Sequence, residues 1–537
     1  MNYYQNNPAA AAGGERENAR RVQTPLMTRP VTAELADDFS LPDYKPEIRR
    51  MIGITATVAP AAHYLSPGHA EFAGPVRYSI LYEGNDGGMW SADLPSEYDL
   101  DLTLDNDPTF EPDGMTAYSD VVCESVTVRV TAPRRLSVRA RLRGDAVVLG
   151  MRRLDETVSG TAGKEEAAGL AADDLKRLEG SAETAEILRA TSDPAEYTDT
   201  FLPDDGGSGE VRVICCRAEP LVGEVSATVE GVSVRGELYI TVLLCRDPDG
   251  ARPFAVTRRI PFAETVATDR APERGASCRA WGCVTSASAE PNENGEIVAT
   301  VGLALTAEVA SAVTVPYTRD VYSSRCESTV VMRECDAAAV KKCMNANITV
   351  SGGEELAALG LDSGIRIIDA TAAVLPDSVE CRTDGGRAVL TGKMRVRVVA
   401  DNGAEIMGKD FDMPFRYETD LPGDGAFVGA GYSEWTVSAP VCRVRPDGER
   451  LSADCELAVS ARFCGRVKLP SVAEVKVGDA RAPRGGCMTV CYPTADDTLW
   501  SVAKRYGADA AVLAASNGLD GTKKAGDKLT GVKYLLV

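Results

Sequence analysis

The stretch Gly74-Pro-Val-Arg-Tyr-Ser-Ile-Leu-Tyr82 decides the fold of this chain, because its pattern returns twice. A glycine is followed by a strand-like alternation of residues, then by a polar turn at 84–88. The same order recurs at Gly236 with a strand expected at 238–245, and at Gly392 with a strand expected at 394–399. The three glycines are spaced by roughly 160 residues, the length of one domain each. The alternation indicates antiparallel strands with one buried face.

Each copy also contains a second hairpin further along the chain. The expected strands lie at 126–143 in the first copy, at 284–289 and 297–304 in the second, and at 441–445 and 451–457 in the third. Turn residues separate these runs, as in antiparallel sheets. The fold class is therefore mainly β, with three β-rich repeats of the antiparallel sandwich or barrel type.

The last fifty residues follow a different pattern. A short strand at 488–492 leads into a polar turn, a first helix starting at Thr498, a second helix ending at Asn517-Gly518, and a closing strand at 533–536. Asp497 is expected to cap the first helix with its carboxylate. Leu499, Val502, Ala503 and Tyr506 fall on one face of that helix. The order of elements is βααβ, and with these motifs the segment resembles a LysM domain, a small α+β module.

The LysM resemblance implies a ligand and a site. The family generally binds N-acetylglucosamine polymers in a shallow groove between the turn before the first helix and the loop after the second. The implied groove residues are Asp496, Asp497, Thr498, Leu499, Asn517, Gly518 and Leu519. The family usually has glycine where this chain has Asp496, which adds a side chain and a charge to the groove. The alternative role for Leu499 and Trp500 is that of ordinary core residues in a small domain.

The first β repeat opens with a second motif. Leu41-Pro42-Asp-Tyr-Lys45-Pro46-Glu-Ile48 precedes a strand expected at 54–58. This opening, with the glycine before the long strand and the proline after it, resembles the SPOCS domain of spore coat morphogenetic proteins. A weaker version stands at 202–205 and 211–214, and the third repeat retains 367–370.

Composition shifts suggest the following domain boundaries. The expected units are a disordered tail at 1–35, SPOCS-like repeats at 36–160, 196–325 and 326–478, a helical insert or linker at 161–195, a hinge at 479–486 and the LysM domain at 487–537. A further short helix is expected at 337–344, where alanines cluster.

Charge and composition narrow the class of protein. Acidic residues outnumber basic ones by 79 to 58, for a net charge of −21, which argues against nucleic acid or an anionic membrane as the main partner. No apolar run reaches the length of a transmembrane helix. The N-terminus lacks the features of a signal peptide, so we expect a protein kept inside the cell. The 15 cysteines are an odd number without zinc-site spacing, which favours reduced thiols and no disulfide framework.

No catalytic constellation emerges from the motifs. The two histidines, His63 and His69, stand in a stretch expected to be a surface loop and have no helical metal-binding spacing. The acidic residues at 99–113 lack the ligand order of a calcium loop and fit the wet face of a strand instead. We therefore expect no enzymatic activity, no cofactor and no metal.

Three functional hypotheses remain open. The resemblances favour a structural scaffold of endospore coat assembly, made in the mother-cell cytoplasm and placed at the forespore surface. Its implied partners are the basement-layer ATPase of the coat and other coat proteins. The alternative is a wall-associated protein that binds peptidoglycan or another N-acetylglucosamine polymer. A phage-tail protein is a third possibility, against which the opening motif at 41–52 argues.

Overall fold

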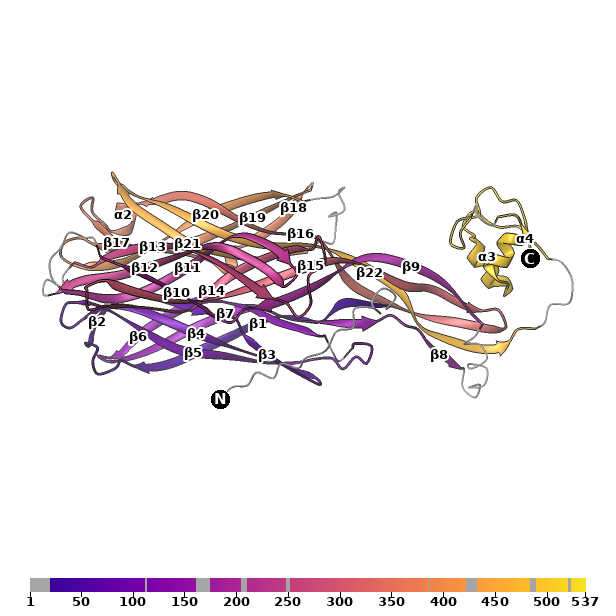
Figure 1. Ribbon diagram of the computed structural model, residues 1–537, viewed down its shortest axis with the longest axis horizontal. Coiled ribbons are helices and arrows are strands. Elements are labelled where there is room, and N and C mark those ends of the chain that lie inside the picture. Colours follow the sequence, from indigo (N-terminus) through magenta and orange to yellow (C-terminus); the bar gives the residue numbers. More distant parts are fainter. Residues whose placement is uncertain are drawn as a thin grey trace.

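The computed structural model describes residues 20–111, 114–160, 174–203, 210–247, 252–384, 386–421, 432–482, 489–519 and 523–537. The prediction of a mainly β chain is confirmed, and within these residues none of the sheets closes on itself. Figure 1 shows long strands gathered into one body, from which a narrower ribbon of strands leads to the small helical domain at the C-terminus.

The first repeat is a sandwich of two antiparallel sheets. One sheet has the order β1 (Arg21–Ser40), β7 (Arg135–Arg153), β6 (Thr116–Ala132), and the other joins β2 (Ile48–Val58), β4 (His69–Gly84), β3 (Ala62–Ser66) and β5 (Met89–Thr103), with β4 central. Alternate side chains of β4, among them Phe72, Tyr78 and Ile80, are fully buried against Val138 and Leu142 of β7. Alternation on the decisive strand thus gives one core face, as predicted.

The second and third repeats build the same kind of sandwich. The second has β10 (Ala195–Phe201), β15 (Ile297–Ser323), β14 (Ser277–Pro291) and β9 (Leu175–Thr191) facing β11 (Glu210–Thr228), β12 (Gly231–Asp247) and β13 (Phe254–Ala267). The third has β16 (Cys326–Glu355), β22 (Arg450–Ala480) and β21 (Tyr432–Asp447) facing β17 (Arg366–Val374), β19 (Arg387–Asp401), β18 (Glu380–Asp384) and β20 (Ile406–Asp420). β8 (Thr157–Gly160), expected in the first repeat, pairs parallel with β22 of the third. Two short helices, α2 (Leu356–Leu359) and η2 (Pro376–Ser378), lie between strands of the third repeat.

The landmark glycines have a packing role. A Cβ atom built on Gly236 would lie 2.6 Å from the ring of Phe262, and one on Gly392 would lie 2.6 Å from the ring of Phe415. Each aromatic ring belongs to the strand paired with the glycine's own strand and lies over the space that the glycine leaves. In the first repeat, Tyr98 lies over Gly74 in the same way. The recurring glycine is therefore required by an aromatic side chain on the neighbouring strand.

The three repeats meet around a common centre. Leu81, Leu243 and Val399 each stand seven residues after a landmark glycine, and all three belong to one apolar cluster. Ile52, Ile214 and Ile368 enter the same cluster from β2, β11 and β17. Equivalent positions of the three repeats thus converge on one apolar cluster.

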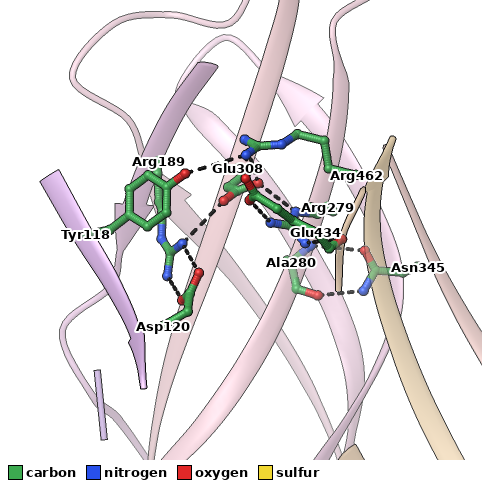
Figure 2. Close-up of polar contacts among 9 residues, drawn as sticks. All are labelled: Tyr118, Asp120, Arg189, Arg279, Ala280, Glu308, Asn345, Glu434 and Arg462. Carbon is green, nitrogen blue, oxygen red and sulfur yellow. Dashed lines mark hydrogen bonds and ion pairs between the residues drawn. The ribbon is translucent and has the colours of Figure 1, made fainter. Parts of the chain in front are cut away.

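A buried ion network lies at the junction of all three repeats (Figure 2). Glu308 of β15 is paired with Arg279 at 2.6 Å, with Arg462 at 3.2 Å and with Arg189 at 3.4 Å. Arg189 also binds Asp120 of the first repeat, and Arg462 binds Glu434 of the third at 2.5 Å. The positive charges of three arginines are thus balanced by the negative charges of three carboxylates.

Arginine contacts control the protonation of this network. Burial alone would raise the pKa of Glu308, but the charges of Arg279, Arg462 and Arg189 together hold it below its ordinary value. The Tyr118 hydroxyl accepts a hydrogen bond from Arg462 at 3.5 Å, and burial raises the pKa of Tyr118. Glu308 is therefore charged at neutral pH, and the network connects residues from all three repeats.

Three predictions about secondary structure are wrong in part. Residues 21–35, expected in the disordered tail, form most of β1. Residues 175–191, expected to be helical, form β9, and the expected helix at 337–344 lies inside β16. Both segments are rich in alanine or glutamate, but they pair with the long strands β15 and β22, and this tertiary pairing outweighs local propensity. Residues 1–19 and 161–173 lie outside the described part of the chain.

Long strands extend beyond the sandwiches to form a stalk. We define the stalk as the paired segments 175–183 with 314–323 and 326–335 with 469–480. Its interior is apolar, with Leu175, Val321, Val475 and Val477 buried together. Residues 479 and 480, expected to begin a hinge, end β22, and residues 483–486 of that hinge lie outside the described residues. The stalk leads to the C-terminal domain (Figure 1).

Candidate functional site

The C-terminal domain has the predicted βααβ order. Its elements are β23 (Val490–Cys491), α3 (Leu499–Tyr506), α4 (Ala510–Ser516) and β24 (Leu535–Leu536), and the two strands pair antiparallel. Leu499, Val502 and Ala503 of α3 are buried against Leu513 of α4, with Tyr506 partly buried beside them. The predicted apolar face of the first helix is therefore the core of this domain.

Thr498, rather than Asp497, is the N-cap of α3. The Thr498 hydroxyl accepts a hydrogen bond from Ser501 N at 3.0 Å, and the Ser501 hydroxyl accepts one from Thr498 N at 2.9 Å, which forms a capping box. Asp497 lies one residue earlier and closes the turn before the helix. Its carboxylate accepts hydrogen bonds from Thr494 N at 2.9 Å and from the Thr494 hydroxyl at 3.0 Å. The prediction that Asp497 caps the helix is wrong by one position.

The turn depends on the charge of Asp497. The hydrogen bond from Thr494 N and those from the Thr494 hydroxyl, Ser501 and Arg505 lower the pKa of Asp497. A carboxyl group whose pKa is lower in the folded state stabilises the fold above its unfolded pKa, which is about 3.9, and loses this contribution as the pH falls further.

Acid should therefore weaken the C-terminal domain through Asp497. We expect the unfolding midpoint of this domain to fall as the pH drops below about 4. Hydrogen exchange of the amides of α3 measures this change. The Asp497→Asn variant should already be destabilised at neutral pH, and it should show a smaller fall with acid than the parent. Equal acid sensitivity in both proteins would contradict this role of Asp497.

The loop after α4 is held by Asn517. Its side-chain nitrogen donates to Leu513 O at 2.8 Å and to Leu536 O at 2.9 Å, and its oxygen accepts from Leu536 N at 2.7 Å. Gly518 then takes a φ of +65°, in the left-handed region that favours glycine. Leu519 is partly buried against the core of the domain. The loop is thus fixed to the closing strand.

A hydrogen-bonded segment connects this loop to the turn before α3. Lys523 N donates to Leu519 O at 3.1 Å, and Leu529 N donates to Asp497 O at 2.9 Å. At the rim, Asp496 forms an ion pair with Lys528 at 2.8 Å, and its side chain is 90% exposed. These hydrogen bonds connect the turn before α3 with the loop after α4, the two segments that contain the predicted groove residues. The side chain of Asp496, where the family usually has glycine, is exposed to solvent.

Trp500 attaches this domain to the stalk. Its indole packs edge-on against Tyr322 of β15 at a centroid distance of 4.8 Å, and its Nε1 donates to Asp320 at 2.8 Å. Lys504 pairs with the same Asp320 at 2.6 Å, and the fully buried Tyr322 donates its hydroxyl proton to Ala508 O at 2.7 Å. Trp500 is therefore a core residue, as the alternative prediction held, and it also carries the contact with the stalk.

The polar contacts described between the stalk and the domain involve residues other than the predicted groove residues Asp496, Asp497, Thr498 and Asn517. They come from the middle of α3 and from residues 507–509, where Asp509 pairs with Lys176 of β9 at 2.8 Å. A Cβ atom built on Gly526 would lie 3.9 Å from Leu178 of β9. Within the described residues, the hydrogen bonds of Asp496, Asp497, Thr498 and Asn517 all run to residues of the same domain. Sequence reasoning missed Asp320 and Tyr322, because on a strand pattern they read as ordinary alternating residues.

Comparison with known proteins identifies the domain. Residues 494–530 match the family model of the LysM domain. The chain contains a LysM domain. No curated protein and no solved structure matches the chain. The SPOCS resemblance of the three repeats stays a prediction.

The two histidines, the acidic run at 99–113 and the buried ion network lie outside the LysM domain. Among the described residues, no group of three or more His, Cys, Asp or Glu side chains could hold a metal ion. Asp99 and Asp101 lie on the exposed side of β5, as predicted for that acidic run. His63 lies on β3 and His69 is the first residue of β4, where a loop was expected, and both side chains are exposed. In the ion network, Glu308, Glu434 and Asp120 are all engaged by arginines (Figure 2). No helix in the described part is long and apolar enough to cross a membrane.

Proposed function

We propose that this chain is a non-enzymatic binding protein whose LysM domain holds an N-acetylglucosamine polymer such as peptidoglycan. The observation that carries the proposal is the LysM match at 494–530, and it is supported by the predicted groove residues Asp496, Asp497, Thr498 and Asn517, whose described hydrogen bonds stay within the domain. The β repeats and the stalk act as a support that fixes the direction of the groove.

The chemistry of the groove suits a neutral glycan. Gly518 has no side chain, and no heavy atom lies within 4 Å of a Cβ built there, so a ligand can approach the loop backbone. The ion pair of Asp496 and Lys528 offers an acceptor and donors at the rim. Sugar hydroxyls and N-acetyl groups can use both, but a bound glycan must also displace water from this charged pair, which weakens its binding.

A pelleting assay tests this proposal. The full chain should sediment with purified peptidoglycan and with insoluble chitin. The Asp496→Gly variant restores the residue that the LysM family usually has, and it should bind about fivefold more tightly, which corresponds to about 1 kcal/mol. An Asp454→Gly variant changes a carboxylate in the third repeat and should bind as the parent does. If the parent and both variants remain in the supernatant, the glycan proposal is wrong.

A second candidate is a scaffold in endospore coat assembly. It is favoured by the SPOCS-like opening at 41–48, which is ordered by hydrogen bonds from Leu41 N to Arg134 O at 2.9 Å and from Ile48 N to Pro133 O at 2.8 Å. The charged rim of the LysM domain suits a protein partner with complementary charges. We propose for this case that the LysM domain engages the basement-layer ATPase of the coat, and the repeats engage other coat proteins, in the mother-cell cytoplasm at the forespore surface.

The same substitution separates the two candidates. If Asp496 helps to recognise a protein, Asp496→Gly should weaken binding to the purified basement-layer ATPase in a titration. If the groove holds glycan, the substitution should increase the fraction of protein that pellets with glycan, and the ATPase should show no binding to either protein in the titration. Opposite responses to one change therefore distinguish the two functions.

A further inference from the structure

Two thiols lie opposite each other on the β21–β22 hairpin of the third repeat. Cys442 and Cys455 are direct partners in the antiparallel ladder, and their Sγ atoms are 3.6 Å apart. Opposed residues in such a ladder have Cα atoms about 4.5–5.5 Å apart. A disulfide needs a Cα separation of about 4.4–6.8 Å. The ladder therefore places the two cysteines at a backbone separation that a disulfide accepts, and the sulfur atoms must move closer to form the bond.

The two thiols differ in accessibility. Cys455 is fully buried in the core of the third repeat. Cys442 is half-buried and lines an open cavity of about 330 Å³ between the second and third repeats. Polar side chains, including Thr257, Tyr239 and the ion-paired Arg217 and Asp369, form other parts of the cavity wall. Cys442 thus lies at the wall of this cavity, and Cys455 lies beside it in the ladder.

We propose that Cys442 and Cys455 form a redox-active pair that a peroxide converts to a disulfide. In the first step one of the two sulfurs attacks hydrogen peroxide, the O–O bond breaks, and a sulfenic acid and one water form. In the second step the other sulfur attacks the sulfur of the sulfenic acid, the S–O bond breaks, and a second water leaves with the thiol proton. Two thiols are oxidised by two electrons and one peroxide is reduced to two waters. The product locks the hairpin whose second strand continues into the stalk.

Peptide mapping of the full chain tests the proposal. Trypsin cuts after Arg443 and Arg450, between the two cysteines, so the disulfide joins two peptides that are otherwise separate. After treatment with hydrogen peroxide and alkylation of the remaining thiols, the joined peptide should appear. It should disappear after reduction with dithiothreitol. The variants Cys442→Ser and Cys455→Ser should each lose it.

A third variant controls for general oxidation. Cys381 is half-buried and packs against the same core, but its ladder partner is Leu390. Cys381→Ser should therefore form the Cys442–Cys455 peptide as the parent does. The proposal is overturned if the parent gives no joined peptide, or if Cys442 becomes linked to another cysteine in preference to Cys455.

Discussion

The Glu308→Gln variant is expected to lose about 3–5 kcal/mol of stability, because removing one partner of a buried ion pair leaves the remaining charges uncompensated. Glu308 is fully buried and is the shared carboxylate of three arginines. The amide keeps the size of the side chain and removes its charge, so the loss is electrostatic. Trp281 packs against Arg279, and its fluorescence during denaturant unfolding reports on this region.

A surface pair provides the matched control. Glu418 pairs with Arg416 on the outside of β20, where the two side chains are 43% and 62% exposed. Glu418→Gln should change stability by less than about 1 kcal/mol, because an exposed ion pair is screened by solvent. If Glu308→Gln unfolds at the same denaturant concentration as Glu418→Gln, the ion network does not hold the three repeats together.

The Trp500→Ala variant is expected to unfold the LysM domain and release it from the stalk. Truncation of a buried aromatic side chain costs about 3–5 kcal/mol, and a domain of this size has little stability to lose. Trp500 is 6% exposed and contacts both the domain core and Tyr322. Hydrogen exchange of the full chain should show loss of protection in α3 and α4, with β12 and β19 unchanged.

Two further variants separate folding from docking. Tyr492→Ala removes an aromatic side chain that is 75% exposed in the same domain, and it should leave protection intact. Asp320→Asn removes the charge that binds Lys504 and accepts from Trp500. It should loosen the contact with the stalk and leave the domain folded. If α3 keeps full protection from hydrogen exchange in Trp500→Ala, Trp500 does not have the core role described here.

The sequence pattern correctly predicted those elements that depend on residues close together in the chain. The alternation at 76–82 predicted a strand with one buried face, and Tyr78 and Ile80 are buried as that pattern requires. The LysM elements followed from helix periodicity and turn residues. The cap position was wrong by one residue, because both Asp497 and Thr498 are good cap residues and only the backbone conformation separates them.

Long-range pairing explains what the sequence could not predict. The segment at 175–191 reads as a helix by composition, and it becomes a strand because β15 provides a partner along its whole length. The contact of Trp500 with Asp320 joins residues 180 positions apart. The opposed pair of Cys442 and Cys455 needs a strand register that spacing alone does not fix. These features depend on which distant segments pair with each other, and the periodicity of one segment does not identify its partner.

Hydrogen exchange of the full chain with and without soluble N-acetylglucosamine oligomers tests the central claim most directly. Bound glycan should increase protection at 496–499 and 517–519, the turn and the loop that we propose to form the groove. Protection at residues 500–509, which dock on the stalk, and in the β repeats should stay the same. Saturating oligomer that leaves 496–499 and 517–519 unprotected, or that protects the docking residues instead, would contradict the account.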